Sequence, residues 1–192
     1  EMRAKEIISS VHPEAYVYAS SEVVNVIREY ERFSSTAMNA YIGPKSARYL
    51  SSLESRLREE GINSQVRIMQ SNGGISTVDN SSARPIGLLL SGPAGGVIGA
   101  CATCEHNKIS DFVTIDIGCT STDNSVILYG TLRFRNHRCT VVWRLPFLLL
   151  ILDIDAIGAG VGSFACIGYV GGFSLGRKSA DAVSGPCCYG RV

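Results

Sequence analysis

The 192-residue sequence lacks the features typical of nucleic-acid-binding and membrane-spanning proteins. Its charge is almost balanced, with 18 Lys and Arg against 17 Asp and Glu, and it has no stretch in which basic and aromatic residues alternate. The longest apolar run, from Leu145 to Leu152, contains Pro146 and is far shorter than the roughly 20 residues of a spanning helix. We therefore expect no nucleic-acid or membrane partner, and we interpret the run as a buried strand.

The sequence also lacks a secretory signal, a disulfide framework and clustered histidines. Residues 1–6 contain no apolar segment behind a basic start, so a cytoplasmic location is expected. The seven cysteines are an odd number in apolar surroundings, and most are expected to be buried thiols. Cys101, Cys104 and His106 have a spacing seen in metal sites, but no second cluster supplies four ligands, so a zinc or redox module is a minor alternative. His12 and His137 have no ligand or triad partner in the sequence.

The first half of the chain has the periodicity of helices followed by a short strand. A helix is expected from Val23 to Arg32, after a serine cap and an acidic first turn. Pro44 should restart the chain, and apolar residues at helical spacing predict a second helix that ends at Gly61. A strand at residues 65–69 should then stop at the turn-forming cluster 70–74.

The second half has a small-residue helix followed by β structure. A helix is expected from Ala94 to about Glu105, and its small face should allow a neighbouring element to approach closely through Gly95, Gly96, Gly99 and Ala100. Residues 112–117 and 125–128 read as two strands of a hairpin, and more β structure is expected up to residue 144. From residue 157 onward, glycine is so frequent that tight loops are expected.

The hairpin turn carries the residues with the clearest chemistry. It combines two carboxylates, a glycine and three hydroxyl side chains, namely Asp116, Gly118, Thr120, Ser121, Thr122 and Asp123. Backbone N–H groups and hydroxyls in a tight turn can donate to phosphate oxygens, and either carboxylate can hold hydrated Mg²⁺. The residue types fit equally well an ordinary hairpin whose polar side chains bond to their own backbone.

Two other glycine-rich motifs give weaker signals. Residues 91–96 open a helix, whose free N–H groups can bind an anion, but the Lys and Ser or Thr of a Walker loop are missing. Residues 157–163 satisfy Gly-x-Gly-x-Gly without a surrounding βαβ unit. Ser163 and Cys166 follow this motif, but the sequence offers no base beside either, so neither is assigned as a nucleophile.

Several stretches, in this order, resemble the hydantoinase A family, which includes N-methylhydantoinases, 5-oxoprolinases and acetone carboxylase subunits. The resemblance covers nearly the whole chain. It is carried by Arg28–Arg32, Asn39–Ile42, Met69–Gly74, Leu90–Val97, Asp116–Gly118, Thr120–Asp123, Ile157–Gly160 and Gly185–Gly190.

The resemblance implies an α/β fold that is part of an actin-like (ribonuclease H-like) ATPase, with a mixed sheet and flanking helices. Residues 1–110 would lead into an interdomain helix at about 94–105, and residues 111–192 would form the second phosphate-hairpin subdomain. The turn would use ATP and Mg²⁺. Its phosphate-facing residues would be Gly118, Thr120, Ser121 and Thr122, with Asp116 and Asp123 catalytic and Asp116 on the metal.

The family resemblance also implies a reaction and its partners. Members are thought to phosphorylate a carbonyl oxygen of a cyclic imide or lactam with ATP and then to open the ring. The expected partners are a small cyclic amide, the rest of a hydantoinase A polypeptide and a hydantoinase B-type subunit.

The sequence departs from the family pattern in ways that favour a central fragment, inactive in isolation. The family's first phosphate hairpin and its adenosine loop are not found in these 192 residues. Cys119 and Val161 stand where the family has Gly, and four residues break the C-terminal signature: Asp181, Ser184, Cys187 and Val192. The alternative is a non-catalytic remnant or a nucleotide-binding interaction module.

Overall fold

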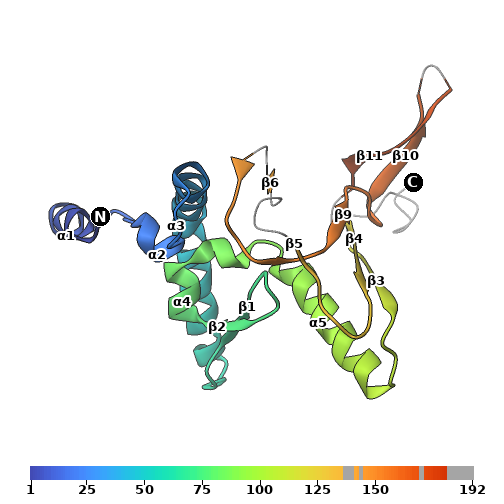
Figure 1. The fold of residues 1–192 in the computed structure, drawn as a ribbon, viewed down its shortest axis with the longest axis horizontal. Coiled ribbons are helices and arrows are strands. Elements are labelled where there is room, and N and C mark those ends of the chain that lie inside the picture. The colour runs from blue at the N-terminus through green and yellow to red at the C-terminus, as the bar shows by residue number, and fades with distance from the viewer. Residues whose placement is uncertain (136–140, 143–144, 169–170, 181–192) are drawn as a thin grey trace. The chain divides into compact units, whose positions relative to one another are not determined.

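The computed structural model describes residues 1–135, 141–142, 145–168 and 171–180 (Figure 1). The chain forms two compact units. Unit 1 comprises Glu1–Gly95 and Phe134–Leu152, and unit 2 comprises Gly96–Arg133 and Asp153–Val192. The expected domains 1–110 and 111–192 remain a prediction. His137, Cys139, Arg144 and the C-terminal departures from the family pattern lie outside the described residues.

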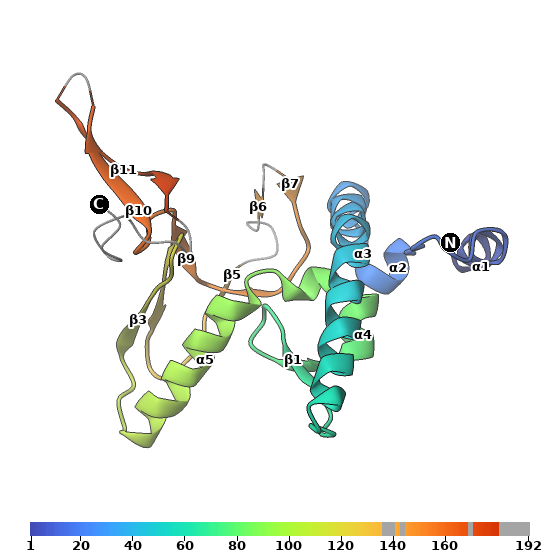
Figure 2. The ribbon, with the colours of Figure 1, turned by 180° about the vertical axis from the view of Figure 1, so that it is seen from behind.

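Unit 1 is mainly helical. Its helices are α1 (Met2–Val11), α2 (Ser20–Val23), α3 (Glu29–Glu59), α4 (Val78–Ala83), the 3-10 helix η1 (Pro85–Leu88) and the first turns of α5 (Ser91–His106). The long helix α3 packs against α4 and η1, and Figure 2 shows this group from behind. None of the helices in the described part of the chain is long and apolar enough to cross a membrane.

The expected helix boundaries are only partly right. The helix predicted from Val23 to Arg32 is wrong, because Val24 is extended and the chain re-enters a helix only at Glu29. Pro44 does not restart the chain but lies inside α3. A proline inside a helix costs about 3 kcal/mol, so the packing of α3 against its neighbours must offset that cost. The end of α3 before Gly61 is confirmed, since Gly61 has a φ of 81° and its N–H donates to Arg58 O.

The strands of unit 1 form short antiparallel pairs. The predicted strand before the turn is confirmed as β1 (Arg67–Met69), which pairs with β2 (Ile75–Thr77) across that turn. In the second part of the unit, β5 (Phe134–Arg135) pairs with β8 (Ile151–Leu152), and β6 (Val141–Val142) pairs with β7 (Leu145–Pro146).

The core of unit 1 is built around the apolar run that the sequence singles out. Its cluster of buried residues is Val23, Val24, Ile86, Phe147, Leu148, Leu149 and Ile151. Most of the run is buried as expected, but Leu145 and Leu150 are exposed, and only the ends of the run are strands. Buried hydrogen bonds fix its backbone, since Leu148 N donates to Ser35 Oγ at 2.9 Å and Leu152 N donates to Ser71 O at 3.1 Å. These bonds satisfy N–H groups that no strand partner reaches.

Unit 2 contains a three-stranded antiparallel sheet in the order β3 (Phe112–Ile117), β4 (Thr122–Ile127), β9 (Asp155–Ile157). The first predicted strand is confirmed, and the second begins three residues earlier than expected. The described strand pairs are all antiparallel, so the expected mixed sheet is not found among them. The tight connection between β3 and β4 allows only an antiparallel pair.

The glycine-rich end of the chain is more regular than expected. The prediction of mostly tight loops is wrong, because β10 (Ser163–Ile167) and β11 (Phe173–Ser179) form an antiparallel hairpin. Phe164, Ile167, Phe173 and Leu175 supply β-forming side chains between the glycines, and these residues favour the extended backbone.

Two further expectations about side chains are wrong in the described part of the chain. A Cβ on Gly95 or Gly96 would meet other atoms only at 3.6 Å or more, and a Cβ on Gly99 would meet none within 4 Å. The small face of α5 is therefore not closely packed there. The four described cysteines are not buried: Cys101 and Cys104 are half-buried, and Cys119 and Cys166 are exposed. Burial was expected because cysteine is among the most often buried residue types, but the fold places these four at accessible positions.

Candidate functional site

The candidate site is the turn between β3 and β4, residues 118–121. Asp116 and Asp123 are direct partners in the strand register, so their side chains leave the same face of the sheet. The turn is closed by a hydrogen bond from Gly118 N to Ser121 O at 2.9 Å. The hairpin thus brings the two predicted carboxylates together at the base of the turn.

The two carboxylates have different surroundings. Asp116 is exposed, and its Oδ2 lies 3.6 Å from where a Cβ on Gly96 would stand, so its side chain points toward α5. Asp123 is half-buried and its Oδ2 accepts a hydrogen bond from Ser121 Oγ at 3.1 Å. Within the described residues no third Asp, Glu, His or Cys joins them. Two carboxylates suit Mg²⁺, which usually keeps several waters and binds one or two carboxylates together with phosphate oxygens.

A second loop supports the turn from one side. In the glycine-rich loop 158–162, Val161 N donates to Gly118 O at 2.9 Å and Gly162 N donates to Cys119 O at 3.0 Å. A Cβ on Gly160 would overlap Gly118 O and lie 2.8 Å from the carbonyl carbon of Cys119. Only glycine therefore allows this approach. The turn and the loop are separate motifs in the sequence, and the structure joins them.

Backbone donors remain free on the turn itself. The N–H groups of Cys119, Thr120 and Ser121 donate to no described residue. Cys119 is exposed and its φ is not positive, so its Cβ does not strain the turn. Consecutive free N–H groups in a turn form a small concave surface that attracts anions.

The three hydroxyls that were expected to face phosphate differ in availability. Ser121 Oγ is bonded to Asp123, and Thr122 Oγ1 donates to Ala159 O at 2.6 Å. Thr120 is exposed, and its hydroxyl has no partner among the described residues. Thr120 and the three backbone N–H groups are therefore the donors that a phosphate would meet first.

The alternative site around Cys101 and Cys104 gains little from the structure. Both lie on α5, where burial, and secondarily the nearby Cys104 and Glu105, raises the pKa of the Cys101 thiol. A raised pKa disfavours the thiolate, which is the form that binds metals and attacks disulfides.

Comparison with known proteins identifies the family. The model of the hydantoinase/oxoprolinase family matches residues 32–191. The chain belongs to this family. It is 31% identical to caprolactamase subunit alpha of Pseudomonas jessenii over its whole length, covering 27% of that protein. It is 36% identical to 5-oxoprolinase of Saccharomyces cerevisiae over 91% of its length, covering 13% of that protein.

Solved structures agree with this membership of the hydantoinase/oxoprolinase family. Nucleotide-free acetone carboxylase matches 97% of the chain with a TM-score of 0.80 and 30% identity, and ATP-dependent caprolactamase from Pseudomonas jessenii matches all of it with 0.72 and 28%. The chain covers 26% and 27% of those two structures. The expected family is thus confirmed, and the fold is α/β, part of an actin-like ATPase-type fold.

Proposed function

We propose that this chain supplies a phosphate-binding turn to an ATP-dependent amidohydrolase that opens a cyclic imide or lactam. The observation that carries the proposal is the set of three N–H groups at Cys119, Thr120 and Ser121 that donate to no described residue, in the turn that joins the two strands carrying Asp116 and Asp123. Membership of the hydantoinase/oxoprolinase family and the ATP dependence named for its solved relatives support the choice of ATP as the anion.

In this proposal each residue of the turn has one task. The free N–H groups and the Thr120 hydroxyl donate to phosphate oxygens, and Asp116 and Asp123 hold hydrated Mg²⁺. Gly118 lets the chain turn, while Ser121 and Thr122 act from inside the hairpin by fixing Asp123 and the glycine-rich loop. When bound, Mg-ATP supplies a phosphoryl group to the amide carbonyl oxygen, which turns a poor leaving oxygen into a good one.

The remainder of the active site would come from other segments. The relatives are far longer than this chain, and several are named as subunits, such as the acetone carboxylase beta subunit of Xanthobacter autotrophicus. We propose that the rest of a hydantoinase A polypeptide and a hydantoinase B-type subunit complete the site, in the cytoplasm. The 192-residue chain alone should then bind Mg-ATP weakly and open no ring.

One observation favours the alternative, a non-catalytic interaction module. The hydroxyls of Ser121 and Thr122 are bonded inside unit 2, as in a hairpin that satisfies its own polar groups. The two functions differ in whether the turn binds nucleotide, so binding measurements separate them.

Asp116→Asn should weaken Mg-ATP binding by about fivefold, equivalent to roughly 1 kcal/mol, at saturating Mg²⁺. The substitution keeps the shape of the side chain and removes the charge that holds the metal. Titration calorimetry at several Mg²⁺ concentrations measures the effect. The control is Glu105→Gln, which removes the same charge from an exposed residue of unit 2. Equal Mg²⁺ dependence in Asp116→Asn and the parent would remove Asp116 from the site.

Cys119→Gly should tighten Mg-ATP binding about threefold, because a phosphate can approach a glycine backbone more closely. The control Cys119→Ala keeps the Cβ and removes only the thiol, so it should bind like the parent. Both variants and the parent are titrated under reducing conditions, and circular dichroism monitors their folding. If Cys119→Gly stays folded and binds no better than Cys119→Ala, the turn is a structural hairpin.

A further inference from the structure

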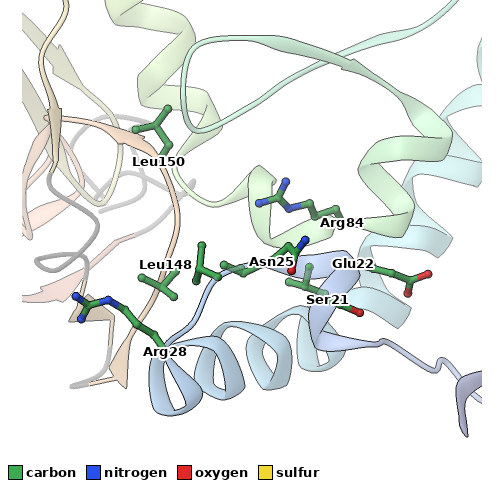
Figure 3. A pocket seen from close by; sticks show the side chains of 10 residues that line it. Ser21, Glu22, Asn25, Arg28, Arg84, Leu148 and Leu150 are labelled. Atoms are coloured by element: carbon green, nitrogen blue, oxygen red, sulfur yellow. The ribbon is translucent and has the colours of Figure 1, made fainter. Parts of the chain in front are cut away.

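Unit 1 contains a cleft that the proposed function does not use. It has a volume of about 540 Å³ (Figure 3). It is bordered by α2 and the segment 24–28 that follows it, by Arg84 at the junction of α4 and η1, and by Leu148 and Leu150. This volume lies within the range of pockets that hold small molecules.

The floor of the cleft is apolar and fixed. Val23, Val24 and Leu148 line it and belong to the buried core of unit 1. The backbone of Leu148 is held by its hydrogen bond to Ser35 Oγ. Val26 and Leu150 line the cleft closer to solvent, with 43% and 39% of their surfaces exposed. A hydrocarbon group of a ligand would lose contact with water against this wall without a rearrangement of the core.

Of the described charged residues that line the cleft, two are paired and Arg84 is not. Glu22 pairs with Lys5 at 2.5 Å, and Arg28 pairs with Glu31 at 3.3 Å. The guanidinium of Arg84 forms no hydrogen bond or ion pair with any described residue, although its backbone is fixed by bonds to Asn80 and Gly87. A guanidinium favours carboxylates, because its planar fork matches their two oxygens.

The same arginine connects the cleft to a family motif. Arg84 and Leu150 also line a cavity of about 210 Å³ beside Gln70, Ser71 and Asn72, which belong to the stretch 69–74 of the family resemblance. Asn25 lines the larger cleft, and its side-chain amide makes no hydrogen bond to a described residue. Gln70 and Ser71 already donate to Ser81 and Gly87 O, so Asn25 is the polar side chain that accompanies Arg84 at the larger cleft, as Figure 3 shows.

We propose that the cleft in unit 1 binds a small aliphatic carboxylate, held by Arg84 at its charged end and by Val23, Val24 and Leu148 along its hydrocarbon chain. Arg84 distinguishes this ligand from a neutral amide, which cannot form a charge-assisted pair. The apolar floor distinguishes it from inorganic phosphate, which gains nothing from a hydrocarbon wall. The site lies in unit 1, apart in the chain from the phosphate turn of unit 2, and does not depend on the proposed reaction.

Titration calorimetry of the whole chain with butanoate, pentanoate, hexanoate and hexanamide tests this site. Affinity should rise along the three carboxylates by up to about fourfold per methylene, and hexanamide should bind at least about tenfold more weakly than hexanoate. Hexanoate should also shift the NMR signals of the Val23, Val24 and Leu148 methyl groups. Equal affinity for hexanoate and hexanamide, or no gain with chain length, would overturn the proposal.

Arg84→Gln should reduce hexanoate affinity at least about tenfold, because it removes the charged partner of the carboxylate. The matched control is Arg67→Gln, which removes the same charge from an exposed residue of unit 1 outside the cleft and should leave the affinity within about twofold. Arg84 is exposed, so its substitution should not unfold the unit, and circular dichroism checks this. Equal losses of affinity in Arg84→Gln and Arg67→Gln would overturn the proposal. So would binding of inorganic phosphate that depends on Arg84 and is as strong as that of hexanoate, because the site would then be only a basic surface patch.

Discussion

Gly160→Ala is expected to separate the glycine-rich loop 158–162 from the β3–β4 turn and to weaken Mg-ATP binding. The added methyl group would overlap Gly118 O and crowd the Cys119 carbonyl, and both obstacles are backbone atoms that cannot rotate away. Overpacking of this kind costs about 3 kcal/mol, and here it falls on the hydrogen bonds from Val161 N and Gly162 N to the turn. A displaced turn should bind Mg-ATP at least about tenfold more weakly.

Amide hydrogen exchange and nucleotide titration measure the two effects separately. In Gly160→Ala, the amides of Val161 and Gly162 should lose protection, since their acceptors move. Gly158→Ala is the matched control in the same loop, because a Cβ there meets nothing within 4 Å and the φ of Gly158 is not positive. Unchanged protection of both amides in a folded Gly160→Ala would contradict the proposed support of the turn. Lost protection with unchanged Mg-ATP affinity would remove the turn from nucleotide binding.

The parts of this fold that sequence predicts well are those set by local chemistry. The strand Phe112–Ile117 follows from its β-forming residues, and the end of α3 before Gly61 follows from the need for a positive φ. The residue types of the carboxylate half, Asp116 and Asp123, were likewise visible in the sequence. Their pairing was not, because the expected second strand began at residue 125 and left Asp123 in the turn, whereas β4 begins at Thr122 and sets Asp123 opposite Asp116.

The other half of the site depends on contacts between distant segments. Loop 158–162 meets the turn mainly through backbone atoms, and a backbone hydrogen bond leaves no side-chain pattern in the sequence. The one available signal was a requirement for glycine at Gly160, but the sequence contains twenty glycines, and some of them meet other needs, such as the positive φ of Gly61 and Gly130. Packing against distant segments also keeps α3 helical at Pro44, although proline disfavours the interior of a helix.

Two of the three hydroxyls of the turn, those of Ser121 and Thr122, form hydrogen bonds within unit 2. A sequence shows a hydroxyl but not its partner, so all three hydroxyls were expected to face phosphate. In the structure, Thr122 Oγ1 holds the glycine-rich loop through Ala159 O, and Ser121 Oγ orients Asp123. In the proposed site, side chains would fix the geometry and backbone N–H groups would contact the anion, so little of the turn would have to be ordered when ligand binds.

Asn39→Asp is expected to destabilise unit 1 by about 3 kcal/mol or more at pH 7, because it places a carboxylate where the core excludes water. Asn39 is fully buried on α3, its Oδ1 accepts a hydrogen bond from Ile86 N at 3.1 Å, and its Nδ2 has no partner among the described residues. The new carboxylate would keep one donor, Ile86 N–H, and would have none for its second oxygen. One neutral donor does not compensate for a buried charge.

The pH dependence of the Asn39→Asp variant identifies this cause. Burial raises the pKa of the new carboxyl in the folded state, so folded protein binds a proton that unfolded protein has released once the pH exceeds about 3.9. The free energy of unfolding, relative to the parent, should therefore fall as pH rises from about 4 toward the folded pKa and stay level below that window. Urea unfolding of Asn39→Asp and the parent between pH 3 and 8 measures the difference.

The control Asn63→Asp places the same charge on an exposed residue and should show almost no pH-dependent loss of stability. A pH-independent difference for Asn39→Asp would mean that lost packing, and not the buried charge, causes the destabilisation.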